Sequence, residues 1–163
     1  MTHNDLVKRA GKWLRNSLHC GVVLEELKNQ GSWEIPDAVG WCGQQCILIE
    51  CKTSLSDFRA DLKKASRNGA PTVGAWRFYL ALPDIVPAEE LPDGWGLYEV
   101  SGRSVHHKAG PEYRNMGNTP FESDKGMESA MLLSVIRRLQ ISSCVYVQPL
   151  IDSTGGGGCK ARK

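Results

Sequence analysis

Apolar positions in the first half of the chain follow first a helical and then a strand-like pattern. In residues 5–18 apolar side chains recur every three or four positions, which predicts an amphipathic helix. Three segments with the composition of strands follow, at residues 20–27, 33–41 and 46–52. The sequence GQQ at residues 43–45 is typical of a turn, so we expect the last two strands to form a β-hairpin.

The pattern continues with a second helix and a fourth strand. Ser54 and Asp57 resemble a capping box in which Asp replaces the usual Glu, and they predict a helix over about residues 55–68. Residues 76–83 are apolar enough for a central strand. The remaining predicted elements are a connection at 84–94 with one helical turn, a hairpin of strands at 95–100 and 104–107, a loop at 108–120, a helix near 127–139 and an edge strand at 143–151.

The order helix, three strands, helix, strand predicts an α/β or α+β domain with a mixed central sheet and C-terminal additions. The chain has 163 residues, enough for one domain with its own hydrophobic core. We therefore expect a single domain over residues 1–150. Residues 151–163 are rich in Gly and basic residues and predict a flexible tail.

Composition places the chain in the class of soluble globular proteins, with 41% hydrophobic and 23% charged residues. No run approaches the roughly 18 apolar residues of a membrane helix, and the N-terminus has no apolar core of a signal peptide. We expect a cytoplasmic protein with no membrane partner. In a reducing cytosol its six cysteines should be free thiols.

Net charge does not identify a partner by itself. The chain carries +2, but the final segment GGGGCKARK holds three cations and no acid, which leaves the rest at −1. Two interpretations of this tail stay open: sequence-independent affinity for nucleic acid, or an inert solubilising end.

Three charged residues stand out in the predicted hairpin. Glu50 and Lys52 are two positions apart in a strand, so they share one face, and Asp37 of the preceding strand can project from the same face. A buried charge is costly unless it is paired or binds a metal. Two carboxylates suit Mg²⁺, and a lysine beside them can stabilise phosphate charge or orient a water. The alternative is a structural Glu–Lys pair at a sheet edge.

The segments EIPDAVGW, ILIECKTSLSDFRADLKK and WRFYLALP together resemble the PD-(D/E)XK nuclease superfamily. Pro36–Asp37 resembles the PD motif, and Glu50–Cys51–Lys52 resembles E-x-K. The resemblance covers roughly residues 5–100 and implies a restriction-endonuclease-like core. SLSDFRADLKK and the later LPDGWGLYEV are similar to a narrower set, the MmcB-like and phage or prophage nucleases.

This resemblance implies roles for particular residues. Asp37, Glu50 and the backbone carbonyl of Cys51 would bind Mg²⁺ or Mn²⁺, and Lys52 would be the catalytic lysine. Many members add another acid from the first helix or strand. The candidates for it are Glu25, with Glu34 and Asp5 behind it.

The resemblance also implies DNA as the partner. Arg59, Lys63 and Arg67 recur at i, i+4 and i+8 of the second helix and are candidates for contacting phosphates, with Arg77 as a further candidate. A solvated face of a helix would have the same pattern.

Three hypotheses follow: a metal-dependent nuclease acting on DNA, a catalytically silent nuclease-fold protein that binds nucleic acid or a protein, and a zinc-stabilised interaction module built on Cys42 and Cys46. His106 and His107 are neighbours in a strand and point to opposite faces, which disfavours a shared site. DNA versus RNA, the oligomeric state (a homodimer is one option) and a setting in repair, phage replication or defence stay open.

Overall fold

The structure is a computed structural model, and it describes residues 1–26, 36–67, 69–113 and 118–141. Three α-helices and six strands occur in these ranges, with short 3-10 turns at Ala65–Arg67 and Ala88–Glu90. In chain order, the helices and strands are α1 (His3–Asn16), β1 (Val22–Glu25), β2 (Ala38–Cys42), β3 (Gln45–Lys52), α2 (Leu55–Asp61), β4 (Trp76–Ala81), β5 (Gly96–Ser101), β6 (Ser104–Ala109) and α3 (Lys125–Ile141).

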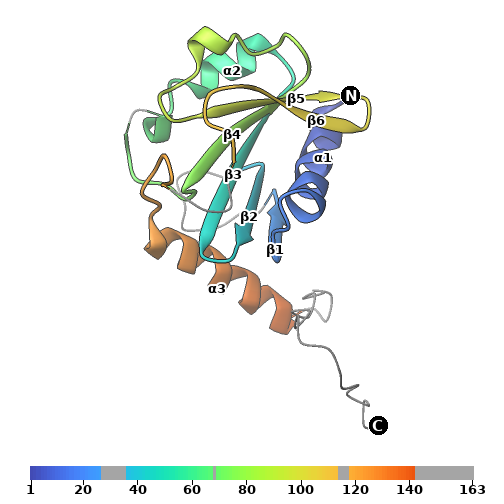
Figure 1. The fold of residues 1–163 in the computed structure, drawn as a ribbon. Coiled ribbons are helices and arrows are strands. Elements are labelled where there is room, and N and C mark those ends of the chain that lie inside the picture. The colour runs from blue at the N-terminus through green and yellow to red at the C-terminus, as the bar shows by residue number, and fades with distance from the viewer. Residues whose placement is uncertain (27–35, 68, 114–117, 142–163) are drawn as a thin grey trace.

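The six strands form one mixed sheet in the order β1–β2–β3–β4–β5–β6 (Figure 1). β1, β2 and β3 are antiparallel neighbours, β3, β4 and β5 run parallel, and β6 returns antiparallel along β5. The parallel pair β3–β4 needs a crossover, and α2 lies in that connection. The predicted α+β class with a mixed sheet is therefore confirmed.

Two apolar cores lie on the two faces of the sheet. α1 packs on one face through Leu6, Ala10 and Leu14, against strand residues that include Ile49 and Phe78. α2 and α3 contribute to the core on the other face, whose buried members include Val39, Leu48, Phe58, Tyr79, Trp95, Leu97 and Met131. β4 is buried along its whole length, as expected for a central strand.

Several local predictions are confirmed. β2 and β3 form a hairpin in which Cys42 faces Gln45, and Gly43 takes the left-handed backbone conformation that the turn requires. Ser54 caps α2 by accepting a hydrogen bond from the Asp57 N–H. β5 and β6 form the second predicted hairpin.

The prediction of one continuous helix over residues 55–68 is wrong. α2 ends at Asp61, and a 3-10 turn at Ala65–Arg67 follows. The side chains of Asp61 and Arg67 pair with each other, and residues six apart do not face each other on an α-helix, so the chain must turn between them.

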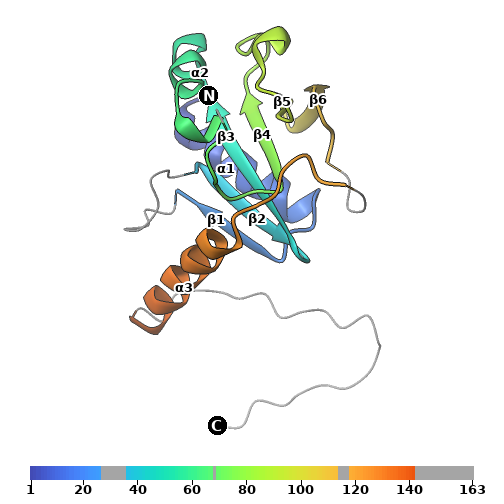
Figure 2. The same cartoon turned by 90° about the vertical axis from the view of Figure 1, so that its left-hand side faces the viewer.

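The C-terminal part contains α3, which contacts the sheet through the buried Met131 and runs out beyond it (Figure 2). Its Glu128 accepts a hydrogen bond from Trp41 Nε1 at 3.2 Å and is also bonded to Ser123. The predicted edge strand at 143–151 and the basic tail at 151–163 lie outside the described residues. No helix in the described ranges is long and apolar enough to cross a membrane.

Candidate active site

The charged residues of the hairpin lie where β3 and β4 end. Both strands run toward α2 (Figure 2), and Lys52 is the last residue of β3. In open sheets with parallel strands, binding sites form outside the carboxyl ends of those strands. The candidate residues are therefore at the end of the sheet where such folds place ligands.

The antiparallel register brings Asp37 beside Glu50. Ala38 pairs with Ile49, so one further step in the same register puts the backbone of Asp37 opposite Glu50, and the charge of Asp37 acts on the Glu50 carboxyl. Asp37 Oδ2 accepts a hydrogen bond from the backbone N–H of Cys51 at 2.7 Å, and Oδ1 lies 3.2 Å from His3 Nε2 at the start of α1. The thiol of Cys51 is buried on the α1 face, as the strand alternation predicts.

Lys52 is held between two carboxylates in the interior. Its Nζ lies 3.4 Å from Glu50 Oε2 and 3.3 Å from Asp61 Oδ1. Lys52 is 4% exposed and Glu50 is 2% exposed. The ammonium is thus paired on two sides, and water reaches it only slightly.

Asp61 connects the strand residues to the segment after α2. Its two oxygens accept hydrogen bonds from Arg67 Nε at 2.7 Å and Nη2 at 3.0 Å, and from the Tyr79 hydroxyl at 2.8 Å. Tyr79 lies opposite Glu50 in the β3–β4 ladder, and the Arg67 guanidinium stacks on the Trp95 ring. Burial alone would raise the pKa of Asp61, but hydrogen bonds from Arg67 and Lys64 hold it well below its usual value.

Glu50 is the least satisfied member of this cluster. Its Oε1 lies 3.1 Å from Arg67 Nη2, within ion-pair distance, yet forms no hydrogen bond in the described part of the chain. Burial raises the pKa of Glu50 to about 7, against the opposing charges of Arg67 and Lys52, and the nearby Asp37 raises it further. In the folded protein Glu50 therefore keeps its proton to a higher pH than a carboxyl in water does.

The donor set fits Mg²⁺ or Mn²⁺ better than zinc. Within the described ranges, no group of three or more His, Cys, Asp or Glu side chains is placed to hold an ion. Mg²⁺ needs only one or two carboxylates, because waters and substrate phosphate complete its shell. The Glu50 oxygen without a hydrogen bond can serve as a ligand, and the Asp37 oxygens keep acceptor capacity beyond their present bonds.

The structure places Glu25 away from this cluster, which contradicts its candidacy as the additional acid. Glu25 pairs with Ala38 in the ladder and faces α1, whereas Glu50 faces the opposite side of the sheet. Its Oε1 lies 3.1 Å from Arg15 and packs closely over Gly11. Glu34 lies outside the described residues.

Asp5, the other alternative acid, caps α1. Its Oδ2 accepts hydrogen bonds from the Thr2 N–H and hydroxyl, at 2.9 and 2.8 Å. The residue that follows β1, Glu26, contacts Asp37 through the backbone, because its N–H donates to the Asp37 carbonyl at 2.9 Å.

Two residues of the site, Asp61 and Tyr79, were not recognised in the sequence. A third, Arg67, was recognised only as an exposed cation. Asp61 had a visible signal, because it lies three residues after the buried Phe58 and so shares the apolar side of α2. The only signal for Tyr79 in the sequence was that a polar hydroxyl stands in a mostly apolar strand. Nothing in the spacing of Arg67 separates a buried partner from an exposed cation.

Two of the four predicted phosphate-binding residues are buried, and this part of the prediction is wrong. Arg67 belongs to the Asp61 cluster, and Arg77 donates from Nε to the Gly74 carbonyl at 3.0 Å while its guanidinium stacks on Phe121. Arg59 is exposed and forms two hydrogen bonds with Glu90. Lys63 is exposed.

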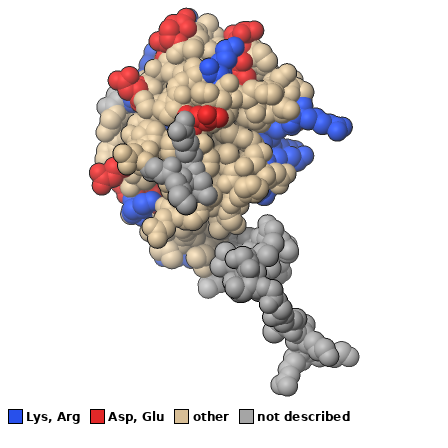
Figure 3. Space-filling view, in the orientation of Figure 1, with Lys and Arg blue, Asp and Glu red and all other residues tan. Residues whose placement is uncertain are grey.

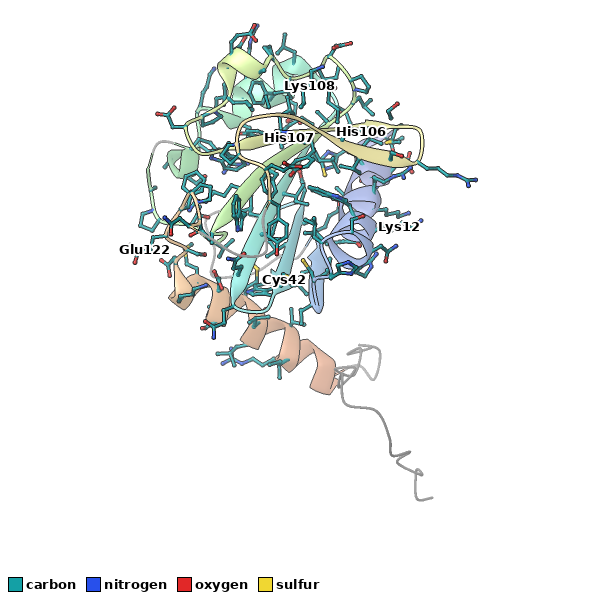
Figure 4. The ribbon with its side chains drawn as sticks, in the orientation of Figure 1. Lys12, Cys42, His106, His107, Lys108 and Glu122 are labelled. Atoms are coloured by element: carbon teal, nitrogen blue, oxygen red, sulfur yellow. The ribbon has the colours of Figure 1, made fainter. Side chains whose placement is uncertain are left out.

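The zinc hypothesis also fails on geometry. Cys42 packs with the α1-side core, whereas Cys46 is buried in the core on the other face, so the two thiols cannot share one ion. The four described cysteines are free. On β6, His107 Nε2 lies 3.0 Å from the Gly110 carbonyl, so this ring has a local structural contact (Figure 4).

Comparisons with known proteins give one informative match. No family model matches the chain, and neither does any curated protein. Among solved structures, a protein of unknown function from Silicibacter pomeroyi is similar, with a TM-score of 0.56 and 24% identity over 86% of this chain and 90% of that one. At this identity the likeness concerns the fold alone.

Proposed function

We propose that the protein is a divalent-metal-dependent nuclease that hydrolyses phosphodiester bonds in DNA. The observation that supports the proposal is the buried Glu50–Lys52 pair at the end of β3, with Asp37 next to it in the β2–β3 register and a Glu50 oxygen that has no hydrogen bond within the described residues. We also propose a cytoplasmic setting, in keeping with the free thiols of the described cysteines.

Asp37 and Glu50 hold the ion in this proposal. A bound Mg²⁺ or Mn²⁺ would neutralise phosphate charge and make a bound water more acidic. Lys52 orients the attacking water and stabilises the charge that develops on the phosphate. Asp61 and Arg67 do not touch substrate; they fix the position of Lys52 and Glu50 through their buried contacts.

One observation favours a second candidate, a catalytically silent nuclease-fold protein that binds nucleic acid or a protein partner. Lys52 and Glu50 are almost fully buried and paired with each other, with Asp61 and with Arg67. A silent domain would keep such a cluster for structural reasons, whereas a nuclease must open it enough for phosphate to enter.

A cleavage assay separates the two candidates. Labelled single-stranded DNA, duplex DNA, branched DNA and RNA are incubated with Mg²⁺, with Mn²⁺ or with EDTA. We expect cleavage of DNA that requires the metal and is abolished in Asp37→Asn, with an unchanged circular dichroism spectrum. If no substrate is cut with either metal, the silent candidate stands. Equal Mn²⁺ affinity of Asp37→Asn and wild type in calorimetry would remove Asp37 from the site.

A further inference from the structure

A cavity of about 770 Å³ lies on the flank of the molecule, between α1 and the turn that joins β5 to β6. Trp13, Asn16 and Ser17 line it on the helix side, and Ser104 and Val105 line it on the strand side. Arg9 fixes the two walls to each other, because its guanidinium donates to the carbonyl oxygens of Gly102 at 2.9 Å and Arg103 at 2.6 Å.

Four cations line this basic groove: Lys8, Arg9, Lys12 and Arg103. Asp5 is the one acid among its lining residues, so the groove carries a charge of +3, more than the +2 of the whole chain. Lys8, Lys12 and Arg103 are exposed, and none of them forms an ion pair within the described part of the chain.

The cations of the basic groove lie together on one side of the molecule. Figure 3 shows Lys and Arg side chains together on the flank formed by α1 and the β5–β6 turn, at the right of the view. The labelled Lys12 in Figure 4 points away from the sheet. Like charges this close repel each other, so they favour an anionic ligand that neutralises several of them at once.

α1 connects this groove to the candidate active site. His3, in its first turn, contacts Asp37, and Asp5, two residues later, lines the groove. Two residues correspond to about 3 Å along a helix axis, and the helix is about 10–12 Å across. The groove therefore begins at the end of α1 that contacts Asp37.

We infer that this basic groove binds the phosphate backbone of a nucleic acid strand and holds the substrate beside the candidate active site. The choice of nucleic acid as the occupant rests on the proposed function. The groove replaces the surface that the sequence predicted on the second helix, because Arg67 is buried in the 3-10 turn after α2 and Arg59 is paired with Glu90.

The shape of the site argues against a membrane surface as the occupant. The cations line a hollow between two walls, which a thin polyanion can enter and a flat bilayer cannot. Of the large apolar side chains that are exposed in the described ranges, Met1 lines the groove, whereas Val22, Leu133 and Ile136 do not. Membrane-binding surfaces combine basic charge with an apolar face.

The test is equilibrium binding of fluorescent DNA in EDTA, which separates binding from cleavage. Wild type, Lys8→Ala/Lys12→Ala and the matched control Lys63→Ala/Arg137→Ala are compared between about 50 and 200 mM salt. Each phosphate contact contributes about 0.9 to the slope of log affinity against log salt on duplex DNA and about 0.7 on single strands. The control removes the same charge from exposed positions outside the groove.

We expect the groove variant to have a slope shallower by about 1.8 on duplex or about 1.4 on single-stranded DNA, and the control to change by less than half as much. Equal slopes in the two variants, or no binding of DNA by wild type, would contradict the proposal that the groove binds nucleic acid. So would tighter binding to phosphatidylserine vesicles than to DNA. A slope difference without cleavage by wild type would support the groove and refute the proposed nuclease, whereas cleavage with equal slopes would do the reverse.

Discussion

The protonation of Glu50 makes a sharp prediction about stability. Its pKa is about 7 in the folded protein and about 4.5 when the carboxyl is in water, so the folded state binds an extra proton between these two values. Stability therefore falls as the pH rises through this window. The substitution Glu50→Gln replaces the carboxyl with a neutral group of similar shape and removes this dependence.

The magnitude follows from the two pKa values. A separation of 2.5 units at 1.36 kcal/mol per unit makes ionised Glu50 cost about 3 kcal/mol above pH 7. Between about pH 5.5 and about pH 8.5 the wild type should lose about 2 kcal/mol of unfolding free energy relative to Glu50→Gln, since part of the cost is already present at the lower pH.

Urea unfolding of both proteins at the two pH values measures this quantity. EDTA is present, because a bound divalent ion would stabilise ionised Glu50. Groups elsewhere titrate in both proteins and cancel in the difference between them. A difference that stays constant within about 0.5 kcal/mol, or that favours wild type at the higher pH, would refute the reasoning. It would mean that Lys52 and Arg67 outweigh the burial and keep Glu50 ionised.

Three other substitutions test contacts of Asp61, Lys52 and Gly74. Asp61→Asn should lower the unfolding free energy at pH 7 by about 3–5 kcal/mol, because it leaves Arg67 and Lys52 without their shared carboxylate; urea unfolding checks this, and a loss below about 1 kcal/mol would contradict it. Lys52→Ala should lower the cleavage rate by about 10² or more and leave DNA affinity unchanged, as single-turnover kinetics and anisotropy would measure. Gly74→Ala should lower the melting temperature, because a Cβ there would lie 2.7 Å from Leu48 Cβ on a left-handed backbone.

The sequence was informative where structure depends on near neighbours. The β2–β3 hairpin follows from a short turn between two apolar runs, and the start of α2 follows from the Ser54 cap. The shared face of Glu50 and Lys52 follows from strand alternation alone. These features need no knowledge of the rest of the fold.

The incorrect predictions concern residues whose surroundings depend on contacts between distant parts of the chain. A basic residue at every fourth position gives the same sequence pattern in a continuous helix and in a helix that ends before the last cation. For Arg67, the ion pair with Asp61 shows that the helix ends. Glu25 was chosen for its place at the end of a strand, but its face depends on the register with β2, and hydrophobic pattern alone did not fix that register. The basic groove joins residues about 90 positions apart, which no local window contains.

The outer edge of β6 has a consequence for solubility. Within the residues that the structure describes, β6 pairs with β5 on one side only, and most of its side chains are exposed, including His106, His107 and Lys108. An unpaired strand edge is a template onto which another chain can add, and a lysine there opposes such addition because its charge would be desolvated in the new sheet. The polar face of β6 thus acts as a barrier to edge-to-edge aggregation at the open side of the sheet.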